Sequence, residues 1–338
     1  FSIGYAGHHD TYPDELPYAR MMANQVGAEH HERVLRVEDL LEFLPRMVWL
    51  QDEPIADPVC VPVYYVSKLA RDAGVVVCQV GEGADELFCG YPVWREALAR
   101  QRAANLWFAP ALARIALAGS GLVGRRHRRS HEMFRRVAAR QPVFWGGAEA
   151  FTHEQKLRLL SPRLRAAMAG RTSWDALRPI RQRFESAAWE KSDLHWMTYL
   201  DLNLRLPELL LMRVDKMAMG VGLEGRVPFL DHEFVSLVLG IPSAAQTRGG
   251  ELKHILKLAV RGLIPDELVD RPKQGFSVPV REWLYGALGS RIDAELQDFC
   301  AQTDLLDASA VRALVSGRND ARVWNLFNLA LWWKTFFR

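Results

Sequence analysis

The segment Val80–Phe88 carries the residue types that a phosphate and metal site needs. Glu82 lies between two glycines, and Asp85 and Glu86 follow shortly after it. Glycines at a turn let the backbone approach a ligand closely and leave N–H groups free for anions. Carboxylates supply the hard oxygen ligands that Mg²⁺ prefers. The segment is therefore a candidate site for a nucleoside triphosphate with Mg²⁺, although acidic residues in a first helical turn are also ordinary partners of the helix dipole.

Alternating strand and helix patterns surround this segment in residues 1–100. The apolar run Val75–Cys78 predicts a short buried strand directly before the glycines. Further strands are predicted at residues 2–4 and 31–37, and helices at residues 14–26, 37–50 and 61–73. This alternation indicates an α/β fold with a parallel sheet covered by helices on both faces. Ligands of such sheets lie at the carboxyl ends of the strands, where the glycine-flanked Glu82 is expected.

Strand patterns fade beyond about Tyr91, and the rest of the chain is helical in pattern. Residues 92–190 are rich in arginine and alanine, and long helical patterns follow at residues 192–219 and 319–337. Residues 106–124 are mostly apolar and precede the basic run Arg125–Arg129. We interpret them as a buried helix followed by a solvated basic loop, so a membrane partner is not expected. A membrane-surface element with a polybasic flank is the alternative.

Composition narrows the class of protein. The chain has 338 residues, of which 49% are hydrophobic and 25% charged, as in ordinary soluble globular proteins. A net charge of +3 is too small to indicate a nucleic-acid partner. The four cysteines, Cys60, Cys78, Cys89 and Cys300, have no zinc-binding spacing. Small buried thiols in a reducing compartment explain them, which favours a cytoplasmic location.

Several motifs occur in an order that points to one family. They are Phe1–Tyr5, Asp52–Pro54, Val80–Phe88, Arg213–Met217, Leu223–Asp231 and Arg271–Phe276. Together they resemble the synthetase domain of the glutamine-dependent asparagine synthetase family over nearly the whole chain. The resemblance implies an adenine-nucleotide α-hydrolase-like (PP-loop) domain with a large, mainly helical C-terminal part. We expect a nucleotide-binding α/β part at residues 1–100, a divergent helical insertion at 101–190 and a helical synthetase part at 191–338.

The resemblance also implies a reaction and its partners. In this family ATP activates a carboxylate, giving an acyl-adenylate and pyrophosphate, and ammonia from a glutaminase domain then attacks the acyl carbon. The implied cofactors are ATP and Mg²⁺, and the implied activity is asparagine synthesis from aspartate. A homodimer is compatible with this interpretation.

Family roles can be assigned to the charged residues of the matching motifs. Glu82 matches the catalytic glutamate that handles the protons of the attacking nitrogen. Lys273 matches the catalytic lysine that contacts pyrophosphate, and Asp85 matches a carboxylate that binds pyrophosphate-bound Mg²⁺. Lys253 and Lys257 lie four residues apart on one face of a predicted helix. We expect this face to be exposed, and the alternative is that either lysine faces phosphate.

Other matching positions are assigned to ligand binding. Ile3 matches the strand residue that packs against adenine, and Val80 and Gly81 match the pair that contacts the nucleotide. The family usually has serine where this chain has Val80, so one hydroxyl contact is lost. Arg226 is assigned to the carboxylate of the substrate.

Two expected family features are missing from the sequence. We find no Ser-Gly-Gly-x-Asp-Ser pyrophosphate loop and no glutaminase domain that begins with a nucleophilic cysteine. We therefore expect the chain to be a fragment that is not competent by itself. Two alternatives stay open for the parent protein. One is amidation of another carboxylate, such as that of a surface-polysaccharide sugar, and the other is a non-catalytic binding module.

Overall fold

The N-terminal strands form parallel pairs flanked by helices. The computed structural model describes residues 1–7, 14–122, 129–275, 278–279, 282, 286, 288–317 and 321–338. Its first elements are β1 (Ser2–Tyr5), α1 (Leu16–Val26), β2 (Glu32–Leu35), α2 (Val37–Gln51), α3 (Cys60–Asp72), β3 (Val77–Gln79) and α4 (Ala84–Leu87). β1 pairs in parallel with β2, with Ser2 opposite Glu32. The α/β character predicted for this part is confirmed.

The second strand pair joins segments that are far apart in the sequence. β3 pairs in parallel with β4 (Glu224–Arg226), with Val77 opposite Glu224. Among the described residues the two pairs are separate, whereas the sequence pattern suggested one sheet. The strand predicted before the glycines is present as β3, but its predicted burial was wrong. Val76 and Val77 are 56% and 54% exposed. The described residues place β4 beside β3 but leave these two side chains uncovered.

Local capping signals explain why the early helix ends agree with prediction. α1 stops at Gly27, whose φ of 65° lies in the left-handed region that glycine adopts without strain. At the start of α2, the Asp39 carboxylate accepts the backbone N–H of Arg36 at 2.8 Å. Both signals are short-range, so each can be recognised from a few residues.

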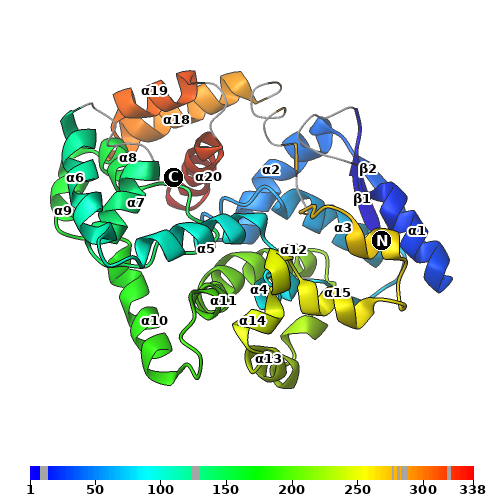
Figure 1. Ribbon diagram of the computed structural model, residues 1–338. Coiled ribbons are helices and arrows are strands. Elements are labelled where there is room, and N and C mark those ends of the chain that lie inside the picture. Colours follow the sequence, from blue (N-terminus) through cyan, green and yellow to red (C-terminus); the bar gives the residue numbers. More distant parts are fainter. Residues whose placement is uncertain are drawn as a thin grey trace.

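The middle of the chain is helical and has its own hydrophobic core. Its elements are α5 (Pro92–Ala104), α6 (Ala109–Leu122), α7 (Arg129–Ala138), α8 (His153–Leu159), α9 (Pro162–Ala167) and α10 (Trp174–Ala187). Trp94, Phe184 and Trp196 are among the buried side chains of this core. Figure 1 shows these helices gathered on the opposite side of the molecule from β1 and β2.

The buried helix predicted within residues 106–124 was wrong. Helix α6 contacts α5 and α7, and these neighbours bury only Ala113 among its described side chains. Leu112 and Ile115 are exposed, and Trp107 just before the helix is 88% exposed. Most of the basic run that follows lies outside the described residues. No helix in the described part of the chain is both long and apolar enough to cross a membrane.

The C-terminal part completes the larger hydrophobic core. Its elements after α10 are α11 (Asp193–Asn203), the π-helix η1 (Leu206–Leu211), α12 (Met212–Met219), β4, the 3-10 helix η2 (Pro228–Leu230), α13 (His232–Leu239), α14 (Ser243–Gln246), the 3-10 helix η3 (Arg248–Gly250), α15 (His254–Val260), α16 (Asp266–Asp270), α18 (Gly289–Thr303), α19 (Ala308–Ser316) and α20 (Arg322–Phe337). α20 packs against α2 and α18, and α12 packs against α3. Met47 and Phe327 are fully buried in this core. All four cysteines carry free thiols.

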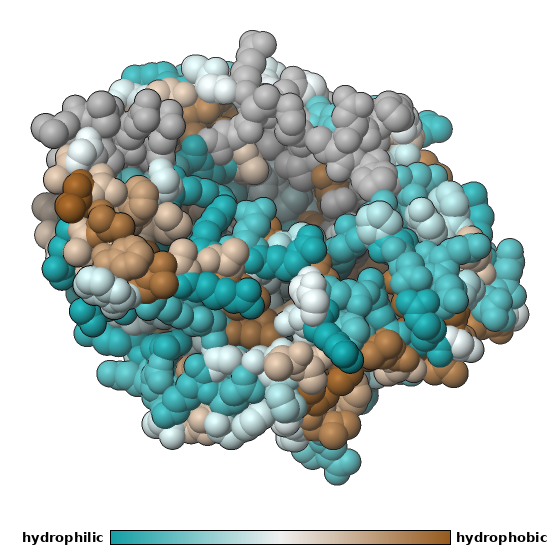
Figure 2. Space-filling view, viewed as in Figure 1, coloured by the Kyte–Doolittle hydropathy of each residue, from teal (hydrophilic) through white to brown (hydrophobic). Residues whose placement is uncertain are grey.

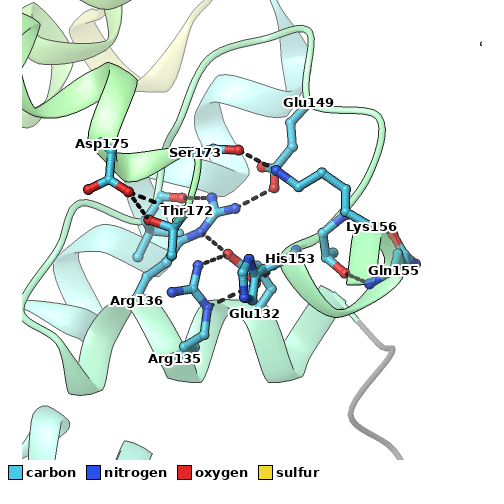
Figure 3. A network of polar contacts seen from close by, with 12 residues as sticks. Glu132, Arg135, Arg136, Glu149, His153, Gln155, Lys156, Thr172, Ser173 and Asp175 are labelled. Carbon is cyan, nitrogen blue, oxygen red and sulfur yellow. Dashed lines mark hydrogen bonds and ion pairs between the residues drawn. The ribbon is translucent and has the colours of Figure 1, made fainter. Parts of the chain in front are cut away.

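A largely buried ion-pair network holds α7 to the loop that follows it (Figure 3). Arg135 and Arg136 donate to the Glu132 carboxylate at distances of 2.6 to 3.1 Å. Arg136 also donates to the Val143 carbonyl at 2.7 Å and to Glu149. Burial alone would raise the pKa of Glu132, but the two guanidinium groups outweigh it and lower that pKa to about 2. Glu132 is therefore a structural carboxylate that stays ionised.

Replacing Glu132 by glutamine should destabilise the protein. Because the lowered pKa favours the folded state above the ordinary pKa of 4.5, the contribution should be fully present at neutral pH and lost as the pH falls toward 2. We expect Glu132→Gln to lower the free energy of unfolding at pH 7 by about 3 kcal/mol in urea titrations. Glu96→Gln, which breaks an exposed pair with Arg100, should cost less than about 1 kcal/mol. Equal effects of the two variants would contradict the assignment.

Candidate active site

A glycine turn at the carboxyl end of β3 presents the acidic residues. The Val80 N–H donates to the Arg226 carbonyl at 2.8 Å, which extends the β3–β4 pairing up to the turn. Gly83 has a φ of 91°, and a Cβ at this position would lie 2.5 Å from Leu230 Cδ2. Both its backbone conformation and the lack of space require glycine. The turn thus fixes where Glu82 leaves the strand and where α4 begins.

Glu82 is held by a buried arginine. Arg213, on α12, donates from Nη2 to Glu82 Oε1 at 2.7 Å and from Nη1 to Asp57 Oδ2 at 2.6 Å. Burial alone would lower the pKa of Arg213, but Asp57 and Glu82 outweigh it and raise that pKa. The guanidinium therefore stays charged and ties α12 to the glycine turn and to the loop before α3.

Asp85 lies between two lysines from distant parts of the chain. Lys273 Nζ is 2.7 Å from Asp85 Oδ2, and Lys253 Nζ is 2.8 Å from Oδ1. Burial alone would raise the pKa of Asp85, but the two ammonium groups outweigh it and lower that pKa. A Cβ at Gly90 would lie 1.8 Å from Asp85 Oδ1 and 2.4 Å from Lys253 Cε. Any larger residue at position 90 would displace Asp85 or Lys253 from their ion pair.

The backbone of Lys253 is also constrained. Its φ is 55°, a left-handed value that is uncommon for residues other than glycine, and its N–H donates to the Phe88 carbonyl at 3.0 Å. These features place Lys253 at the end of α4, directly before α15 begins. The expectation that this lysine lies on an exposed helix face was wrong. Lys257 instead pairs with Glu251 at 3.1 Å.

A second buried acid lies behind the lysines. Tyr91 donates its hydroxyl hydrogen to Glu86 Oε1 at 2.5 Å, and Arg205 Nη1 is 3.9 Å from the same oxygen. Burial raises the pKa of Glu86. The Arg205 guanidinium lies 4.4 Å from the centre of the Tyr91 ring, and Lys273 Nζ lies 5.9 Å from it. The Tyr91 ring therefore makes cation–π contacts with both Arg205 and Lys273.

Arg205 connects this group to the helical middle of the chain. It is 3.6 Å from Asp201 Oδ2, and Asp201 Oδ1 accepts the Gly147 N–H at 3.0 Å. Asp201 is fully buried, and burial raises its pKa to about 6. A Cβ at Gly147 would lie 2.6 Å from Arg205 Nη1 and 2.9 Å from Asp201 Oδ2, so any other residue here would displace these side chains.

The structure brings together some of the residues assigned from sequence. Lys273 and Asp85 are in contact although 188 residues separate them. Val80 and Gly81 belong to the same turn as Glu82. The Arg226 backbone is beside this turn, but its side chain is 69% exposed and pairs with Glu224 at 3.1 Å. Ile3 lies in the main hydrophobic core on β1, in the other strand pair.

Sequence reasoning assigned no role to several residues of this group. Arg213 is the first residue of the family motif Arg213–Met217, and membership of this motif was the only sign of a role in the site. Asp57, Tyr91 and Arg205 gave no signal of their own, because their partners come from segments far away in the sequence.

Asp85 is the residue in this group best suited to share a magnesium ion. Within the described ranges no group of three or more His, Cys, Asp or Glu side chains is placed to hold a metal. Mg²⁺ in nucleotide sites commonly takes one or two carboxylates together with phosphate oxygens and water. One ionised carboxylate beside two lysine ammonium groups is compatible with that donor set.

Comparison with known proteins decides the family. The family model described as asparagine synthase matches residues 1–334. The chain belongs to the asparagine synthase family. The expected resemblance is thereby confirmed, and the asparagine synthase match includes the glycine turn, Arg213 and both lysines that contact Asp85.

Curated relatives share most of this chain. Asparagine synthetase (glutamine-hydrolyzing) 1 of Bacillus subtilis is 28% identical over 342 residues, covering 98% of this chain and 51% of the relative. A putative asparagine synthetase (glutamine-hydrolyzing) of Mycobacterium tuberculosis strain H37Rv is 32% identical over 339 residues, covering 95% and 49%. Amidase chyE of Penicillium rubens is 24% identical over 310 residues, covering 84% and 44%. The chain thus spans about half the length of the curated relatives it matches.

The close fit at Gly90 can be tested by adding one methyl group. Gly90→Ala should displace Asp85 or Lys253 and lower the free energy of unfolding by about 1–3 kcal/mol, measured by urea denaturation. Gly119→Ala is a matched control, because a Cβ there meets open space on a helix and should leave stability unchanged or slightly raised. Unchanged stability in Gly90→Ala would mean that the Asp85 cluster is not fixed as described.

Proposed function

We propose that this chain carries the ATP-dependent, amide-forming step of a glutamine-dependent asparagine synthetase. A substrate carboxylate attacks the α-phosphate of ATP, giving an acyl-adenylate and pyrophosphate. Ammonia then attacks the acyl carbon, and the products are the amide, AMP and a proton. The observation that carries this proposal is the Lys253–Asp85–Lys273 cluster next to Glu82, at the carboxyl end of a parallel strand.

The two lysines are proposed to bind the pyrophosphate that leaves. Their ammonium groups are paired with one carboxylate, so the cluster of Lys253, Lys273 and Asp85 carries a net positive charge. A polyphosphate can take over the lysine contacts, which leaves Asp85 oxygens for Mg²⁺. When bound, Mg²⁺ neutralises charge on the phosphates. Tyr91 keeps Lys273 near this position through its ring face.

Glu82 is proposed to accept a proton from the attacking nitrogen. Arg213 holds this carboxylate through a hydrogen bond of 2.7 Å to Oε1. We assign nucleotide contacts to Ile3, Val80 and Gly81, and contact with the substrate carboxylate to the exposed side chain of Arg226.

The parent protein is proposed to supply the rest of the site. The relatives are about twice as long as this chain. We assign the missing pyrophosphate loop and the ammonia-producing glutaminase domain to other segments of that protein, and a PP-loop fold to the completed α/β part. Residues 1–100 and 191–338 would form the site, with residues 101–190 packed behind it. We also propose a cytoplasmic location, because the proposed reaction consumes ATP.

The reaction can be tested through its first half. In the protein expressed from its whole native gene, aspartate should stimulate exchange of labelled pyrophosphate into ATP. Lys273→Ala should lower the exchange rate by about 10²-fold or more, because charge on pyrophosphate is no longer neutralised. Exchange that depends on another carboxylate, such as a uronic acid, would change the proposed acceptor. Absence of exchange with any carboxylate would contradict the function.

Lys253 offers a sharper test, because the chain contains a matched control four residues away. Lys253→Met should lower the exchange rate by about tenfold or more, since the second cation beside Asp85 is lost. Lys257→Met removes an equal charge that pairs only with Glu251 among the described contacts, and it should leave the rate unchanged. If Lys253→Met exchanges at the wild-type rate, Lys253 only positions Asp85 and does not contact phosphate.

A further inference from the structure

Helix α6 and the residues before it expose a contiguous group of large apolar side chains. Figure 2 shows brown and tan residues gathered on the side of the molecule where Figure 1 places α6. The exposed residues, which we call the α6 apolar face, are Leu106, Trp107, Phe108, Leu112 and Ile115. Single exposed apolar residues are normal on protein surfaces, but a cluster of this kind marks an interaction site.

The spacing of this face follows one side of a helix. Phe108, directly before α6, is followed by Leu112 and Ile115 at spacings of four and three residues, and the Leu112 N–H donates to the Phe108 carbonyl, so the three lie in one helical row. Helix α7 packs against α6, and the row is left outside that contact. α6 therefore presents an apolar row outward, opposite to the orientation expected for a surface helix.

The sequence segment that carries the α6 apolar face is basic, although Glu185 and Asp193 from α10 and α11 lie beside Leu106 and Trp107 at one end of the face. Between Ala97 and His131 the sequence contains seven arginines and neither aspartate nor glutamate. Of the described arginines, Arg102 and Arg114 are exposed beside the apolar residues. Tryptophan, phenylalanine and leucine flanked by arginine are the composition of elements that lie in the interface of anionic membranes.

We propose that the α6 apolar face docks on an anionic lipid surface, with α6 lying in the plane of the membrane. The row of Phe108, Leu112 and Ile115 would enter the boundary between headgroups and acyl chains. Arg102 and Arg114 would contact lipid phosphates. The helix would rest on the membrane rather than cross it, because its 14 residues are too few to span the hydrocarbon core.

Charge argues against a second copy of the chain as the occupant. In a two-fold dimer the same patch meets itself, so the arginine-rich, acid-free segment would face its own copy. Like charges placed together in this way oppose association, whereas an anionic membrane is complementary to them. The proposal does not rest on the proposed enzymatic function, because binding to lipid needs neither ATP nor the residues around Asp85.

Vesicle co-sedimentation tests the proposal. The protein should pellet with vesicles that contain phosphatidylglycerol and not with vesicles of phosphatidylcholine alone, and high salt should release it. The double variant Leu112→Glu, Ile115→Glu should bind at least about tenfold more weakly, because it removes apolar burial and adds charge that anionic lipid repels. Arg114→Ala alone should weaken binding roughly fivefold.

Leu263→Glu is the matched control. Leu263 is 73% exposed and lies outside the α6 apolar face, so this variant should bind as the wild type does. Circular dichroism of each variant checks the fold. Pelleting that is absent, independent of anionic lipid, or unchanged in the double variant would overturn the proposal. It would equally be overturned if sedimentation equilibrium showed a dimer that the double variant dissociates, because the face would then be an interface between copies.

Discussion

The ion pairs of Arg213 are the contacts on which the rest of the site depends. This buried guanidinium joins Asp57, Glu82 and its own helix α12, three segments that are widely separated in the sequence. A buried arginine is tolerated only when its charge is met by well-placed carboxylates, and losing one partner typically costs about 3–5 kcal/mol. The glycine turn after β3 therefore cannot shift without breaking this pairing, and every residue that the turn presents inherits its position.

The charges beyond Arg213 are nearly all paired within the protein. Asp85 forms ion pairs with two lysines. Glu86 accepts a hydrogen bond from Tyr91 and pairs with Arg205. An incoming anion must therefore compete with protein carboxylates for the lysines. This competition favours ligands with several negative charges over singly charged ones, because only they can replace the Asp85 contacts and still gain energy. If the site binds phosphate as proposed, this pairing would favour polyphosphate over ligands with a single charge.

Local signals in the sequence predicted much of the fold, and long-range pairing could not be predicted in the same way. Gly27 and Asp39 mark the end of α1 and the start of α2 through contacts with residues only a few positions away. The β3–β4 pairing and the Lys253–Asp85 contact join distant segments, and neither leaves a local trace in composition or periodicity. The family motifs predicted that Lys273 and Asp85 belong to one site. Helix α6 shows a different limit, since an apolar row has the same pattern whether it faces a core or the solvent.

The π-helix η1 sets the angular relation between the two arginines that flank it. Arg205 directly precedes η1 and Arg213 follows it in α12, and Pro207 lies within its first turn, where a missing N–H disturbs ordinary α-helical bonding. One residue of an α-helix corresponds to a rotation of about 100°. The wider turn of η1 therefore changes the direction in which side chains after it leave the helix axis, compared with an uninterrupted α-helix. It lets one helix aim Arg205 at Glu86 and Arg213 at Glu82, so the length of this segment is constrained even where its side chains touch no charge.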